Sequence, residues 1–336
     1  MRLLAVLTVL LLAACGPQER TTTATAPALD TKLLDREIGD IAARAAPAAF
    51  DVGVHSIDGG DSWALSGKRA FPLQSVFKAP LGAAVLSEVD AGRLSLDDEI
   101  TLGVEDLSPP YSPVADAWPG VKTYTVRELL VRAVGGSDNT AADVLMHRIG
   151  GPGMVQAWLD EHRIVGLRID RYERELQTEI YGLSSFRPAW RGEEAFTAAI
   201  AKVPPARRAA AMRAYLADPR DTATVSGALS FLDKLVNGQL LSPGSTALLL
   251  EIMTDTTTGQ ARLKAGAPDA ASVAHKTGTG RTDLGVNPVT NDIGVITLKD
   301  GRRYAVAVFL AGSRANDAAR DKLIADTARA VVDAAD

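Results

Sequence analysis

A serine and a lysine stand three residues apart in the stretch Phe71-Pro-Leu-Gln-Ser75-Val-Phe-Lys78. The apolar run from Ala79 to Ala91 follows, and Gly92 after it is a typical C-cap, so the stretch is predicted to begin a buried helix. Residues at i and i+3 of a helix share one face, so the Ser75 hydroxyl and the Lys78 amine can come within hydrogen-bond distance. A nucleophile, a base and the unpaired N–H groups of a helix N-terminus are requirements of acyl transfer.

The serine–lysine pair alone is weak evidence for catalysis. The pattern S-x-x-K also arises by chance, and Ser75 could simply cap the helix. Pro80 has no N–H to donate to the Val76 carbonyl, so the helix is expected to start irregularly. Further chemistry-bearing residues are needed before the pair can be assigned a function.

Composition restricts what the chain can do. Its 336 residues are 46% apolar, enough to bury a large core in one domain or in two closely packed lobes. The net charge is −5 and no lysine- or arginine-rich run is present, so no nucleic-acid partner is expected. A single cysteine excludes an internal disulfide and a thiolate metal site. The four histidines lack HxxxH and HExxH spacing, and no G-x-S-x-G is present, so we expect neither a metal nor a cofactor.

The first residues have the pattern of a secretory signal. Met1-Arg2 is followed by the apolar stretch Leu3 to Leu12, which is too short to span a bilayer. The sequence Leu12-Ala-Ala-Cys15-Gly16 then resembles a bacterial lipobox, although an ordinary signal peptide cut nearby would look similar. We expect removal of residues 1–14, lipidation of Cys15 and a membrane-anchored protein in the periplasm. Residues 15–32 are expected to form a flexible tether to a domain spanning residues 33–336.

Hydrophobic periodicity predicts an α+β fold. The region 94–176 is expected to be mainly helical, and a capping box at Thr125 and Glu128 opens one of its helices. Strand patterns occur near both chain ends, which predicts one antiparallel sheet with flanking helices and an all-α lobe over about 75–240. The predicted helices are Leu33–Ala45, Val126–Val134, Asn139–Ile149, Ser245–Met253 and Ala315–Ala335, and the predicted strands are Phe50–Ser56, Ser62–Ser66, Ser272–Thr277, Asp292–Leu298 and Arg303–Ala311.

Two further clusters carry polar groups. Ser137-Asp138-Asn139 offers a hydroxyl and an amide between two predicted helices, where it could also be only a helix N-cap. Lys276-Thr277-Gly278-Thr279 ends a predicted strand with a cation, hydroxyls and a glycine that allows close approach of the backbone, or it could be a plain strand exit. The three clusters in this order are much more specific than any one of them.

S-x-x-K, S-D-N and K-T-G in this order resemble the signature of class A β-lactamases, which belong to the penicillin-recognising serine enzymes. Tyr111-Ser-Pro-Val-Ala looks like the cleft-wall segment of that family, and Arg171-Tyr-Glu173-Arg-Glu-Leu-Gln177 resembles its Ω-loop motif. Within class A, Thr256–Lys264 and Asn291–Gly294 are similar to the branch that contains extended-spectrum cephalosporinases.

The resemblance implies a role for each motif residue. Ser75 would attack the lactam carbonyl, activated by Lys78 or, through a water, by Glu173, and Glu173 would activate the water that hydrolyses the acyl-enzyme. The backbone N–H groups of Ser75 and Thr279 would form the oxyanion hole, and Ser137 would pass a proton to the leaving nitrogen. Substrate would be bound by Tyr111, Asn139, Gln177, Lys276, Thr277, Gly278 and Thr279.

Three departures from the family pattern stand out. Residue 177 is Gln where the family usually has Asn, and Ile293 occupies the place of a frequent strand arginine, for which Arg262 is the nearest replacement. Arg262 would either support the substrate carboxylate or be a surface residue. Residues 180–218 are far longer than the matching part of the Ω loop, and Pro204-Pro205 divides them into a predicted helical hairpin over about 187–217. The hairpin would be a flap beside Glu173 or surface decoration; decoration is expected, because Glu173 and Asp221 remain.

The expected function is hydrolysis of the β-lactam amide of penicillins and cephalosporins by a monomeric enzyme. A D-alanyl-D-alanine peptidase and a penicillin-binding sensor that never turns over are the alternatives. Glu173 argues against the peptidase, because the Ω-loop motif that contains it is absent from the related transpeptidases.

Overall fold

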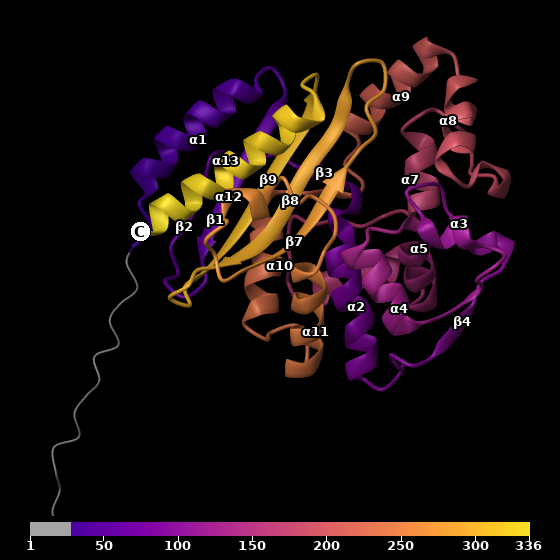
Figure 1. The fold of residues 1–336 in the computed structure, drawn as a ribbon, viewed down its shortest axis with the longest axis horizontal. Helices are drawn as coiled ribbons and strands as arrows, with labels where there is room; N and C mark the ends of the chain where they lie inside the picture. Colours follow the sequence, from indigo (N-terminus) through magenta and orange to yellow (C-terminus); the bar gives the residue numbers. More distant parts are fainter. Residues whose placement is uncertain (1–27) are drawn as a thin grey trace, which may run out of the picture.

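The computed structural model describes residues 28–336, and its centre is a five-stranded antiparallel sheet (Figure 1). The strand order is β2-β1-β9-β8-β7. The sheet consists of β1 (Ala49–Ser56), β2 (Ser62–Ala64), β7 (Ser272–Thr279), β8 (Asn287–Thr297) and β9 (Arg303–Ser313). Val54 of β1 pairs with Val306 of β9, so the two chain ends meet in one sheet and the predicted fold class is confirmed.

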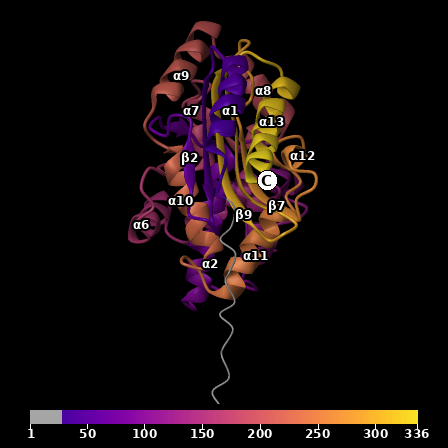
Figure 2. The same cartoon turned by 90° about the vertical axis from the view of Figure 1, so that its left-hand side faces the viewer.

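The two faces of the sheet are buried by different helices. Residues of β9 alternate, as the period of a strand requires: Val306 and Val308 pack in one apolar cluster, whereas Ala307 and Phe309 pack in the other. The first cluster includes residues of α1 (Thr31–Ala45) and α13 (Asp317–Ala335), which lie side by side (Figures 1 and 2). The second includes residues of α2 (Lys78–Asp90), α10 (Val225–Val236) and α11 (Pro243–Thr254).

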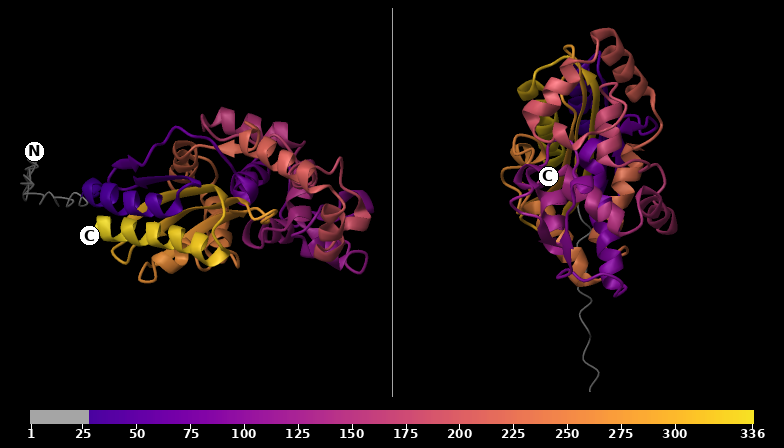
Figure 3. Two further views of the ribbon diagram at one scale, coloured as in Figure 1. Left: turned by 90° about the horizontal axis from the view of Figure 1, so that it is seen from above. Right: turned by 90° about the vertical axis from the view of Figure 1, so that its right-hand side faces the viewer.

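The remaining helices form a lobe beside the sheet (Figure 3, left). Its centre is α2, which is buried on every side from Lys78 to Leu86 because its sequence is apolar all round. Around it lie α3 (Pro113–Ala117), α4 (Val126–Leu130), α5 (Asn139–Arg148), α6 (Pro152–Glu161) and α7 (Glu173–Glu179). The short helix α12 (Leu263–Gly266) is not part of the lobe and packs against α13.

The lobe is not entirely helical, which corrects the prediction of an all-α lobe over about 75–240. β4 (Glu99–Thr101) pairs with β5 (Thr123–Thr125), and β3 (Phe71–Pro72) pairs with β6 (Thr222–Ala223). These strands have only two or three residues each, too few for an alternating pattern to emerge from the sequence.

Two helices depart from regular α geometry. The 3-10 turn η1 (Gln74–Phe77) precedes α2, which confirms the predicted irregular start. The capping box at Thr125 and Glu128 opens α4 as predicted, but the α-helix ends at Leu130 and continues as the π-helical turn η3 (Val131–Gly135). A π turn is common at functional sites, and this one leads into the Ser137 loop.

The insertion, residues 180–218, folds as the predicted helical hairpin. It contains the turn η4 (Pro188–Trp190) and the helices α8 (Glu193–Ala201) and α9 (Pro205–Ala217). Phe196, Ile200, Met212 and Tyr215 form a buried cluster with side chains of α7 and with Val289 of β8. The hairpin therefore packs on the body of the protein.

The folded part begins before the predicted boundary at residue 33. Leu29 is buried, and the Asp30 side chain caps α1, whose first residue is Thr31. Residues 29–32 are thus part of the domain and not of a tether. Cys15 and the predicted signal sequence lie outside the described residues. Within residues 28–336, no helix is long and apolar enough to cross a membrane.

Candidate active site

The Ser75 hydroxyl lies in η1, directly before α2, beside the amine of Lys78, the first residue of α2. Their Oγ and Nζ atoms are 3.0 Å apart, as the i, i+3 spacing predicts. Nζ of Lys78 also donates to the Ser137 carbonyl at 2.8 Å and to Oδ1 of Asn139 at 2.6 Å. It lies 3.0 Å from Oε1 of Glu173, and both side chains are fully buried. One amine thus joins the first two motifs to the Ω-loop glutamate.

The Ser137-Asp138-Asn139 motif is held in place by Asp138. Its carboxylate accepts the N–H of Ala141 at the N-terminus of α5 and the N–H of Val114 in α3. The expected N-cap function of the tripeptide is therefore real, and it belongs to Asp138. Ser137 has a φ of 60°, a left-handed conformation that turns the loop between η3 and α5.

The third motif lies against the first two because β7 passes unusually close to η1. A Cβ on Gly278 would stand 2.3 Å from the Leu73 carbonyl oxygen, so only glycine allows this approach. Nζ of Lys276 lies 3.0 Å from Oγ of Ser137. Burial, together with the nearby Lys78 charge, holds the pKa of the Lys276 amine well below its usual range. A bound anion would compensate for that buried charge, so this position suits a substrate carboxylate.

Glu173 is the first residue of α7 and is fully buried. Its Oε1 is 3.4 Å from the Ser75 hydroxyl, and its Oε2 accepts a hydrogen bond of 2.8 Å from Nε2 of Gln177. The carboxylate therefore faces the serine on one side and is held by an amide on the other. Gln177 performs this second contact although the family usually has Asn at the position.

Asp143 positions Glu173 and was not predicted from the sequence. Its carboxylate, on α5, accepts the N–H groups of Glu173 and Arg174 at 2.7 and 3.0 Å and the Ser108 hydroxyl at 2.6 Å. Burial raises the pKa of Asp143 to about 7 against these hydrogen bonds, and the Glu173 charge adds to the rise. The only sequence signal was its position six residues after Ser137, about one turn into the next helix.

The Ω loop and its insertion are closed at the base by a buried ion pair. Nε of Arg171 lies 2.6 Å from Oδ2 of Asp221, and both side chains are almost fully buried. Oδ1 of Asp221 also accepts the backbone N–H groups of Asp170 and Arg171. The residues that flank the insertion therefore stay together in spite of its length.

Arg262 is buried, so the interpretation of Arg262 as a surface residue is wrong. It is 6% exposed, and its Nη2 donates to Oγ1 of Thr279 at 2.8 Å. Ile293 of β8 pairs with Lys276, so no arginine side chain from that position reaches the third motif. Arg262 supplies a guanidinium there from another direction.

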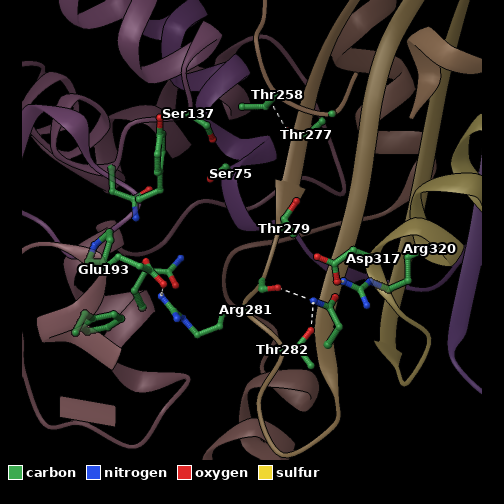
Figure 4. Close-up of a pocket in the computed structure, with 18 of the residues that line it drawn as sticks. Ser75, Ser137, Glu193, Thr258, Thr277, Thr279, Arg281, Thr282, Asp317 and Arg320 are labelled. Carbon is green, nitrogen blue, oxygen red and sulfur yellow. Dashed lines mark hydrogen bonds and ion pairs between the residues drawn. The ribbon is translucent and has the colours of Figure 1, made fainter. Parts of the chain in front are cut away.

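One cleft of about 580 Å³ brings the motifs together (Figure 4). Ser75, Tyr111, Ser137, Asn139, Gln177, Thr277 and Thr279 line it, whereas Lys78, Glu173 and Lys276 are buried behind its surface. Tyr111 is 61% exposed, so it stands at the rim.

The far end of the cleft is lined by residues that sequence reasoning missed. Glu193 and Phe196 come from the insertion, and Arg281, Asp317 and Arg320 come from the sheet side. Glu193 pairs with Arg281, as Figure 4 shows, so the insertion closes this end of the cleft. No pattern in the sequence linked α8 to the loop that follows the third motif.

This geometry defines a serine acyl-transfer hydrolase. A serine at a helix start contacts a buried lysine and a buried glutamate, and a second lysine beside it offers an anion site.

Comparison with known proteins gives the family. Residues 33–335 match the family model described as the beta-lactamase enzyme family. β-Lactamase VEB-1 of Pseudomonas aeruginosa is 31% identical over 287 residues, 85% of each chain. The extended-spectrum β-lactamase PER-1 of Pseudomonas aeruginosa is 30% identical and is matched over 77% of this chain and 73% of its own. The solved structure of a class A β-lactamase described as the last common ancestor of Gram-negative bacteria is 34% identical, with a TM-score of 0.72 over 90% of this chain and 98% of its own.

The chain belongs to the beta-lactamase enzyme family. It is a class A serine β-lactamase and hydrolyses β-lactams.

Proposed function

We propose that this β-lactamase forms an acyl-enzyme on Ser75 and hydrolyses it with a water activated by Glu173. The observation that carries the proposal is the position of the Ser75 hydroxyl, 3.0 Å from Nζ of Lys78 and 3.4 Å from Oε1 of Glu173. Either group can accept the serine proton during acylation, Glu173 through a water. The N–H groups of Ser75 and Thr279 bind the oxyanion, and Ser137 returns the proton to the leaving nitrogen.

The substrate carboxylate is bound by Lys276, Thr277 and Thr279, with Arg262 behind them. A cationic and hydroxyl-rich surface of this kind favours an anion through charge-assisted hydrogen bonds. Asn139 is placed to hold the amide of the substrate side chain, because its side chain lines the cleft next to Lys78. Tyr111 at the rim contacts the substrate ring.

Glu173 favours full hydrolysis over the two alternatives, a D-alanyl-D-alanine peptidase and a sensor that remains acylated. Both alternatives need the nucleophile, but neither needs a base that rapidly hydrolyses a β-lactam acyl-enzyme. A buried carboxylate that Gln177 and Asp143 hold in place beside the serine is the arrangement that water activation requires.

The substrate range that we propose includes extended-spectrum cephalosporins. PER-1, one of the relatives described above, is named an extended-spectrum enzyme. The segment Thr256–Lys264 places Arg262 behind Thr279, which fits the resemblance to that branch in sequence.

We further propose that the enzyme is a periplasmic monomer anchored to the membrane through a lipidated Cys15. The lipobox-like sequence at residues 12–16 supports the anchor. In the described part of the chain, the folded domain begins at Leu29, so thirteen residues, 16–28, separate it from Cys15. That length allows the cleft to stand clear of a bilayer surface.

Labelling with a fluorescent penicillin tests the nucleophile, and nitrocefin hydrolysis tests the reaction class. Ser75→Ala is expected to abolish covalent labelling, and labelling that survives would place the nucleophile elsewhere. Purified wild-type protein is expected to turn nitrocefin over rapidly. Very slow colour would favour the peptidase, and a single stoichiometric burst would favour the sensor.

A further inference from the structure

We propose that Tyr215, on helix α9 of the insertion, positions Glu173 for deacylation through Gln74 and Gln177. Tyr215 is a positioning residue, because its side chain lies two hydrogen-bonded residues away from Glu173. The inference rests on the proposed function of Glu173 as the base that activates water. It replaces the expectation that the insertion is surface decoration.

A chain of hydrogen bonds connects the insertion to the glutamate. Nε2 of Gln74 donates to the Tyr215 hydroxyl at 2.8 Å, and Oε1 of Gln74 accepts from Nε2 of Gln177 at 2.9 Å. The same Nε2 of Gln177 donates to Oε2 of Glu173 at 2.8 Å. Gln74, Gln177 and Tyr215 are all buried, so water does not readily substitute for a lost partner.

The direction of these bonds gives Tyr215 its function. Glu173 is a carboxylate that accepts, so Gln177 must present its NH₂ group, and that group can then be shared only with an acceptor on Gln74. Gln74 must therefore present its carbonyl to Gln177 and its NH₂ group to Tyr215. Burial raises the pKa of the Tyr215 phenol, which keeps the hydroxyl neutral. Its oxygen accepts the bond from Gln74 and so stabilises the amide orientation that Glu173 needs.

Gln74 has few other ways to be held. It precedes Ser75 and has a φ of 47°, in the left-handed region that non-glycine residues rarely adopt. A side chain on such a turn depends on its partners for orientation, and the described contacts of its amide are Tyr215 and Gln177. Loss of the Tyr215 oxygen would allow the amide to rotate and present its NH₂ group to Gln177.

The insertion holds Tyr215 firmly enough for this task. Met212 and Tyr215 pack in the cluster formed with α7, and Arg208 of the same helix pairs with Asp283 beyond the end of β7. The guanidinium of Arg281, in the loop after β7, contacts two residues of α8: it pairs with Glu193 and donates a hydrogen bond to the Thr197 hydroxyl. Both helices of the insertion are tied to the sheet side of the cleft.

Tyr215→Phe tests the inference, because it removes one oxygen and keeps the ring. We expect acylation of Ser75, followed as kcat/KM for a penicillin, to stay within about threefold of wild type. Deacylation is expected to slow by about ten- to a hundredfold, since a small displacement of a catalytic group can cost that much. KM should then fall with kcat, and the acyl-enzyme should accumulate in mass spectra. Tyr304→Phe is the matched control: Tyr304 is equally buried, in the cluster between the sheet and α13, and should change neither rate.

Two further measurements decide the route of the effect. In a Gln74→Met background, Tyr215→Phe should change deacylation less than twofold, because the connection is already broken. If Tyr215→Phe lowers the Tm markedly, Tyr215→Met, which also lacks the oxygen, repeats the test. Wild-type deacylation in a folded Tyr215→Phe protein, or an undiminished further loss in the Gln74→Met background, would overturn the inference. Glu173→Gln separates this from the proposed function: if that variant accumulates no acyl-enzyme, it is the assignment of Glu173 that fails.

Discussion

Nη2 of Arg262 donates a hydrogen bond of 2.8 Å to Oγ1 of Thr279, while Nε of the same guanidinium pairs with Asp321 of α13 at 2.7 Å. The side chain also donates to the Asn291 carbonyl of β8 at 2.9 Å. These contacts fix the arginine behind β7, so that its charge and the Lys276 amine stand on the same side of the cleft. A guanidinium thus lies beside Thr279 although Ile293 occupies the strand position where the family often has arginine.

Arg262→Ala is expected to raise KM by about tenfold or more, because a hydrogen bond to a charged group contributes about 1.5–3 kcal/mol. The acylation and deacylation steps should be affected much less than binding. Steady-state kinetics with a penicillin measure the change. Arg36→Ala is the control, since Arg36 is a largely exposed residue that pairs with its neighbour Glu37. An unchanged KM in Arg262→Ala would limit Arg262 to a structural function.

Asp221→Ala is expected to destabilise the fold, because it removes the most buried of the three carboxylates that pair with the buried Arg171. Breaking one partner of a buried ion pair costs about 3–5 kcal/mol. Chemical denaturation of both proteins measures the loss. Glu88→Ala removes the partner of the exposed Arg93 and should cost about 1 kcal/mol or less. Equal losses in the two variants would show that the base of the Ω loop does not depend on this ion pair.

Asp143 predicts a pH dependence of stability. Folding raises its pKa from 3.8 to about 7, so between these values the folded state binds more protons than the unfolded state. Its contribution is therefore fully present below pH 4 and is lost as the pH rises toward about 7. The loss is on the order of 1.4 kcal/mol for each unit of the rise in pKa.

The measurement compares the free energy of unfolding of wild type and Asp143→Asn by denaturation between pH 5 and 8. Asparagine does not titrate, so wild type should lose stability relative to the variant as the pH rises. A difference that does not change with pH would contradict the raised pKa.

The sequence predicted those parts of the site that are local. Ser75 and Lys78 are one helical turn apart, so spacing alone predicted that their side chains meet, and Lys276 to Thr279 were recognised as the end of one strand. The order of the three motifs then gave the family. The sheet was also predictable, because its long central strands alternate strongly enough to be recognised.

Contacts between distant residues could not be predicted in this way. Gln74 and Tyr215 are 141 positions apart, and nothing in the local pattern of either indicates the other. In the sequence, Asp143 looks like any polar residue on a helix, because its hydrogen bond from the Glu173 N–H depends on how α7 packs against α5. The strands β4 and β5 are stabilised by their pairing and not by their composition, so a region that reads as helical contains them.

Cys15→Ser is expected to move the protein from the membrane fraction to the soluble fraction. A single acyl chain binds membranes only marginally, whereas the diacylated cysteine of a lipoprotein gives stable anchoring. Fractionation of cells that produce each protein, with the activity measured in each fraction, checks this. Equal solubility of wild type and variant would mean that the first residues act as an ordinary signal peptide.

The central claim is that Glu173 activates the water that releases the product from Ser75. Intact-protein mass spectrometry of Glu173→Gln after brief exposure to a penicillin tests it most directly. We expect a persistent adduct of one penicillin per protein, because loss of a general base slows the step by about 10²–10⁴-fold. The adduct should be absent from a Ser75→Ala, Glu173→Gln double variant. Turnover by Glu173→Gln at the wild-type rate, without any accumulated adduct, would contradict the claim.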